Sequence, residues 1–147
     1  MNKLLLNHRA RNHIRFFPMK DAVNDIPADP ALQIKWCQTE FKRLQHSESA
    51  DRLFLEKHRG LGYMITVWEM DGLYYLIHCL RNEFKTFNTT IYISKNKDDM
   101  LSIAKFLKDN IVQIMSDYKS QILEARDALV KAKIEEQIDT TGNNNDA

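Results

Sequence analysis

The dipeptide Asp71-Gly72 constrains the fold of this chain more than any other feature of its sequence. It separates two runs rich in aromatic and β-branched residues, which cover residues 61–70 and 73–80. Asp-Gly favours a two-residue turn of type I′, because both central positions of that turn need a positive φ. The pattern therefore predicts a β-hairpin.

A third strand and a helix are predicted directly after the hairpin. The second run, 73–80, is apolar on both faces, which is typical of a central strand covered on both sides. Residues 87–93 alternate between apolar and polar side chains, a pattern that fits an edge strand. Asn96 or Ser94 then provides an N-cap for a helix whose first turn carries Asp98 and Asp99.

A first helix is predicted before the sheet. Asp29 is a suitable N-cap, and Pro30 suits the first helical position because its missing N–H would be unpaired there. From there to about residues 45–48, the apolar side chains share one helical stripe: Ile34, Cys37, Phe41 and Leu44. Residues 52–55, which follow, form either a short helical turn or a lead-in strand.

The C-terminal part of the chain predicts a long helix. From Met100 there is no Gly or Pro before Gly142. A continuous helix over 97–138 would be ~60 Å long, longer than a domain of this size. Either the helix breaks near 116–120 and folds back, or it projects and pairs with a partner, which is the preferred interpretation. The spacing of the apolar residues matches a coiled-coil seam and predicts a homodimer through Ile111, Met115, Tyr118, Ile122 and Leu129.

The predicted fold class is α+β: a three-stranded antiparallel meander packed with an N-terminal helix and a long C-terminal helix. A length of 147 residues suits one domain. We expect a basic N-terminal arm over 1–20, a core domain over 21–115, a helical extension over 116–138 and a disordered tail over 139–147.

The N-terminal arm is the one region with a strong charge bias. Residues 1–20 carry five Lys and Arg and no acid, although the whole chain has a net charge of only +1. Such an asymmetry is typical of a surface for phosphates or for an acidic protein partner. Phe16 and Phe17 indicate that the end of the arm packs on the body of the protein.

No catalytic motif is present in the sequence. It contains no Gly-rich phosphate loop, HExxH, CxxC or GxSxG pattern. His58 could act as a general acid or base, but no second residue is spaced to work with it; His78 is expected in the core. Cys37 and Cys79 are expected to be buried, reduced thiols. We therefore expect a non-enzymatic protein without cofactor or metal. No apolar run approaches the ~18–20 residues that span a bilayer, so we also expect the protein to be cytoplasmic.

The order of three strands and a helix over about 60–110 resembles that of AP2-type and integrase arm-type DNA-binding domains. In those families, Arg, Lys and Trp side chains on an exposed sheet face read the major groove. The strands of this chain offer only Trp68, Arg81 and Lys85 for that role. The resemblance is therefore one of element order.

Two functions remain for the sequence. The first is a small regulatory or inhibitory protein-binding module, such as a phage or mobile-element accessory factor, because Met64, Trp68 and Met70 would form an interface if no helix covers them. The alternative is nucleic-acid binding through the basic arm. Near-neutral charge and strands poor in basic residues favour the first. The expected contacts with a protein or nucleic-acid partner are Arg9, Arg11, Arg15, Lys57, Arg59, Trp68 and Arg81.

Overall fold

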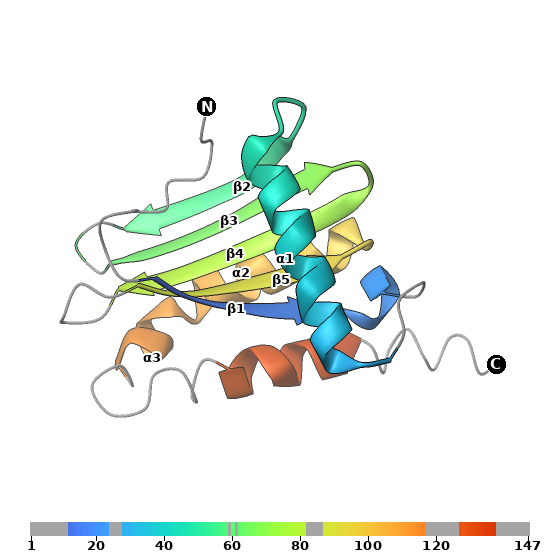
Figure 1. The fold of residues 1–147 in the computed structure, drawn as a ribbon. Coiled ribbons are helices and arrows are strands. Elements are labelled where there is room, and N and C mark those ends of the chain that lie inside the picture. Colours follow the sequence, from blue (N-terminus) through green and yellow to red (C-terminus); the bar gives the residue numbers. More distant parts are fainter. Residues whose placement is uncertain are drawn as a thin grey trace.

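The structure is a computed structural model, and it describes residues 12–23, 28–58, 60, 62–81, 87–116 and 127–137. Its elements, shown in Figure 1, are β1 (Asn12–Pro18), η1 (Lys20–Val23), α1 (Pro30–His46), β2 (Asp51–His58), β3 (Tyr63–Met70), β4 (Leu73–Arg81), β5 (Phe87–Ser94), α2 (Lys97–Asp109) and α3 (Ile111–Ser116). Residues 127–137 are also helical. The strands form one mixed, five-stranded sheet in the order β1-β5-β4-β3-β2. The α+β class is confirmed, and the predicted meander is the β3–β4–β5 part of this larger sheet.

The local signals of the sequence act as expected. At the turn between β3 and β4, Asp71 has a φ of 54° and Gly72 a φ of 81°, and the flanking residues Met70 and Leu73 pair. The Asp29 carboxylate accepts a hydrogen bond of 3.0 Å from the Ala31 N–H and so caps α1. Local chemistry therefore determines where these elements begin and turn.

Two predictions about the strands are settled by pairing between distant segments. Residues 52–55 belong to β2, which pairs antiparallel with β3, so the lead-in strand was the correct alternative. The prediction that residues 87–93 form an edge strand is wrong, because β5 lies between β4 and β1 and pairs in parallel with β1. Its polar residues Thr89 and Thr90 are consequently buried.

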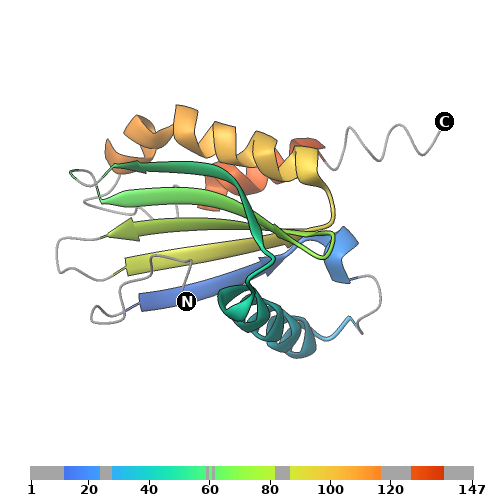
Figure 2. The same ribbon diagram turned by 90° about the horizontal axis from the view of Figure 1, so that it is seen from above.

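The sheet is covered on both faces (Figure 2). α1 crosses one face and α2 lies on the other. The core beneath α1 includes Cys37, Phe41, Leu44, Trp68, Met70, Tyr75, Ile77, Ile91 and Ile93. The core on the opposite face includes Ile65, Val67, Leu76, Leu80, Met100, Ile103, Leu107, Val130 and Ile134. Of the possible interface predicted from the sequence, Trp68 and Met70 are thus buried beneath α1, and Met64 is half-buried.

The C-terminal segment does not continue as one projecting helix. α2 ends at Asp109, and α3 begins after Asn110, whose side-chain amide donates to the Phe106 carbonyl at 2.8 Å. The preferred interpretation, projection, is wrong for residues 127–137, because Val130 and Ile134 are buried in the same core cluster as α2. The apolar positions face the sheet, so burial is achieved within the chain.

The end of the expected arm also belongs to the fold. Residues 12–18 form β1, so the sheet begins before residue 21, the expected start of the core. The Phe16 ring packs edge-on against Phe41 of α1 at 6.0 Å between centroids, and Phe17 lies 5.5 Å from Tyr92. The expected tail over 139–147 lies outside the described residues. No helix in the described part of the chain has the length and apolar character needed to cross a membrane.

Candidate functional site

A groove lies where the end of β1, the N-terminal turn of α1 and the helix over 127–137 meet. Its main cavity, of about 420 Å³, has an apolar lining of Phe17, Pro18, Met19 and Ile134. Its polar lining consists of Lys20, Gln33, Lys131 and Glu135. A smaller cavity of about 150 Å³ lies next to it, and both cavities are lined by Phe17, Lys131 and Ile134. The volume of the main cavity falls within the range of ligand-binding clefts in proteins.

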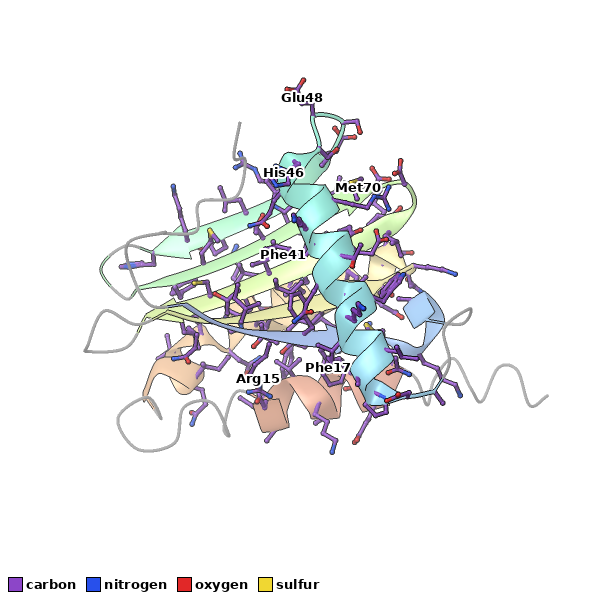
Figure 3. All side chains as sticks on the ribbon, in the orientation of Figure 1. Arg15, Phe17, Phe41, His46, Glu48 and Met70 are labelled. Atoms are coloured by element: carbon purple, nitrogen blue, oxygen red, sulfur yellow. The ribbon has the colours of Figure 1, made fainter. Side chains whose placement is uncertain are left out.

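One wall of the groove is the helix over 127–137, which three polar contacts tie to the rest of the fold. The Asp127 carboxylate pairs with the Arg15 guanidinium of β1. The Lys133 ammonium lies over the Phe106 ring, 5.8 Å from its centroid, and the Gln137 amide donates to Asp99 at 3.2 Å. Buried Val130 and Ile134 add the apolar contact. Figure 3 shows Arg15 and Phe17 on β1 beside this helix.

A carboxylate after β1 links η1 to the end of β5. Asp21 of η1 accepts from the Ser94 hydroxyl at 3.0 Å and from the Lys95 N–H at 3.2 Å. Burial raises the pKa of nearby Asp99, with the charges of Asp21 and Asp98 acting in the same direction. Asp99 also accepts from Gln137, so this carboxylate links the start of α2 to the helix over 127–137.

Arg15 is the one predicted arm contact that the structure places. Its side chain is about half exposed, but its charge is balanced by Asp127. This pairing makes Arg15 part of the groove rather than a free phosphate contact. Arg9 and Arg11 lie outside the described residues.

The remaining predicted contacts do not form one surface. Lys57 is exposed on β2, at the opposite edge of the sheet from β1. Trp68 is only 6% exposed beneath α1, so its ring is not presented to a base. Arg81 ends β4, but its side chain lies outside the described part, as do Arg59 and Lys85. The exposed sheet face of the DNA-binding domains named above therefore has no counterpart where α1 and α2 cover this sheet.

The predicted dimer seam is used inside the chain where it is described. Ile111 is 8% exposed and belongs to the core cluster, against which Leu129 is also packed. The Met115 side chain, Tyr118 and Ile122 lie outside the described residues. Ile111 is therefore buried within the chain, and Leu129 is partly buried against the same core.

A polar cluster under α1 has a structural role. The buried Glu40 carboxylate accepts from Arg43 at 2.9 and 3.1 Å and from the Tyr75 hydroxyl at 3.3 Å, and Arg43 also reaches Asp71 at 3.2 Å. Burial, followed by repulsion from Glu40, raises the pKa of Tyr75. These contacts fasten α1 to the β3–β4 turn.

Both cysteines are buried free thiols, as expected. His58 is exposed at the end of β2, with its ring stacked 6.1 Å from that of Tyr63, and His78 is buried in β4. Within the described ranges, no three His, Cys, Asp or Glu side chains are arranged to hold a metal ion.

The groove was not found from the sequence. The alternation in residues 13–17 was a weak strand signal, but nothing local indicated that this strand would pair with β5. The groove joins two segments that lie more than 100 residues apart in the sequence. One contributes Lys20 and the other contributes Lys131, Ile134 and Glu135, and only the return of 127–137 to the sheet brings them together.

Comparison with protein-family models, curated protein sequences and solved structures gives no significant match.

Proposed function

We propose that the chain is a small, non-enzymatic protein-binding module that regulates or inhibits its partner by binding it. The observation that supports this proposal is the groove on β1, which combines a cavity with an exposed aromatic side chain on a sheet edge. Phe17 is 39% exposed there, and Ile14 on the same strand is equally exposed. Exposed apolar side chains beside a concave surface are typical of protein interaction sites.

The proposal is tested by photo-crosslinking in cells of the source organism. A benzophenone amino acid replaces Phe17 in one variant and Leu53 in the other. Leu53 is the matched control, because it is 38% exposed but lies on β2, the opposite edge of the sheet. We expect one protein to crosslink from position 17 and not from position 53.

The crosslinked protein is then purified and titrated with the full-length chain. We expect micromolar or tighter binding, a change in the partner's own activity, and at least about tenfold weaker binding for Phe17→Asp but not for Leu53→Asp. Circular dichroism of both variants checks that they fold. Lys131→Glu provides a second, exposed change in the groove if Phe17→Asp does not fold.

A different result would support the alternative function. If no protein binds, but generic DNA or RNA binds with a steep salt dependence that Arg9→Ala and Arg11→Ala reduce, the protein-binding proposal is rejected in favour of the basic arm.

A further inference from the structure

The outer edge of β1 has backbone groups that point away from the sheet. In a parallel ladder, the residues that bond to the neighbouring strand alternate with residues that do not. The Met19 N–H donates to the Ile93 carbonyl at 2.8 Å, and the register with β5 is regular along β1. It follows that the backbone N–H and C=O groups of Arg15 and Phe17 bond to β5. The backbone N–H and C=O groups of Ile14 and Phe16 point outward, away from the sheet.

The outward ladder ends at the cavity. Pro18 is the next outward-pointing residue, and it has no N–H to offer. At this point the strand meets the cavity lined by Phe17, Met19 and Ile134. An extended segment running along β1 would make backbone hydrogen bonds at Ile14 and Phe16 and then find space for a large side chain.

The other edge of the sheet differs in ways that discourage pairing. β2 has a register shift between Arg52 and Phe54, and its exposed residues include Asp51, Arg52 and Lys57. Bulges and charges are the usual protection of edge strands. β1 carries the exposed charge of Arg15 and ends at Pro18, but its pairing with β5 has no register shift, so β1 is the edge better suited to an incoming strand.

The charged residues that line the groove indicate which kind of partner segment would bind there. Its lining carries two ammonium groups, Lys20 and Lys131, against one carboxylate, Glu135, while Arg15 is balanced by Asp127. This surplus of positive charge favours a segment with an acidic residue next to its apolar one.

A second copy of the chain fits this edge poorly. The antiparallel pairing that would join Ile14 and Phe16 of two copies places Arg15 directly opposite Arg15 of the other copy. Asp127 reduces the repulsion between these two guanidinium groups, but the positive surplus of the groove is the same on both copies, so a second copy offers it no complementary charge. Charge complementarity thus points to a different protein.

We infer that β1 binds an extended partner segment as an added sixth strand, with a bulky apolar side chain in the 420 Å³ cavity and an acidic residue beside Lys20 and Lys131. This inference rests on the proposed function, because it specifies how the partner binds.

The test begins with a phage-displayed library of random peptides of about ten residues, a length that spans an ordinary strand. It is selected on the full-length protein and counter-selected on Phe17→Asp. We expect the enriched peptides to share a large apolar residue with Asp or Glu within about three positions. The selected peptides should bind Leu53→Asp as tightly as they bind the unchanged protein, and Lys131→Glu about tenfold more weakly.

Two further measurements separate strand addition from other modes of binding. Each peptide is N-methylated at one backbone position at a time. Methylation at every second position, where the N–H would bond to β1, should weaken binding about tenfold, and methylation at the positions between them should have little effect. Amide hydrogen exchange by NMR should slow at Ile14 and Phe16 on binding and stay unchanged at Arg15 and Phe17, which already bond toward β5.

The inference and the proposed function fail differently. If the natural partner crosslinks from position 17 but N-methylation has no alternating effect, strand addition is rejected and protein binding stands. Absence of any peptide enriched over Phe17→Asp also rejects strand addition. If the protein alone is a dimer that Phe17→Asp dissociates into folded monomers, the groove belongs to a second copy and the inference is overturned.

Discussion

At the scale of single residues, Cys37 shows how the α1 interface determines reactivity. Its thiol is fully buried between α1 and the sheet, and this burial raises the pKa of the group to about 11, with the Glu40 charge adding a smaller effect in the same direction. Since the thiolate is the reactive form of cysteine, Cys37 should be inert while α1 stays in place.

We expect iodoacetamide at pH 8 to alkylate Cys37 far more slowly in the native protein than in urea. At this pH only about one thiol in a thousand would be ionised in the folded state, and the side chain is covered as well. Intact mass spectrometry of a Cys79→Ser variant follows this single thiol. Equal rates in buffer and in urea would contradict the burial of Cys37 beneath α1.

At the scale of elements, the helix over 127–137 forms a wall of the groove, and two kinds of contact hold it. Ile134 is 4% exposed in the core, whereas the Arg15–Asp127 pair lies at the surface. Burial of an aliphatic side chain contributes several times more stability than an exposed ion pair. The groove should therefore depend mainly on Ile134 and Val130.

This difference predicts two unequal losses of stability. Ile134→Ala should lower the free energy of unfolding by about 2–4 kcal/mol, and Asp127→Ala by less than about 1 kcal/mol. Urea denaturation of the two variants measures both. An Asp127→Ala loss as large as that of Ile134→Ala would show that the ion pair holds the helix.

At the scale of the whole molecule, residues 111 and 129 decide whether the chain needs a second copy to bury its apolar surface. Both pack against the core of the same chain. These two of the five predicted seam residues are therefore used within the chain, which leaves less apolar surface for a coiled-coil dimer. We therefore expect a monomer at micromolar concentrations.

Sedimentation velocity of the unchanged protein and of Leu129→Asp tests this expectation. The substitution should lower stability by about 1–3 kcal/mol, because it places a charge against the core, and it should leave the sedimentation coefficient unchanged. A dimer that Leu129→Asp converts into a stably folded monomer would instead restore the predicted homodimer.

The sequence by itself determined the features whose causes lie within a few residues. The steric needs of Asp71-Gly72 set the hairpin, and the side chains of Asp29 and Asn96 set the starts of α1 and α2. The apolar character of residues 73–80 correctly placed β4 inside the sheet. Each of these follows from local geometry, hydrogen bonding or side-chain pattern.

Only the tertiary structure decided the pairing of β1 with β5 and the return of residues 127–137 to the sheet. An apolar stripe predicts that one face of a helix is buried, but it does not indicate whether the same chain or a second chain buries it. Likewise, the polar alternation of β5 is compatible with an edge or an interior position. Which arrangement forms depends on the total apolar area that the whole chain buries. The groove exists because β1 pairs with β5 and because residues 127–137 return to the sheet.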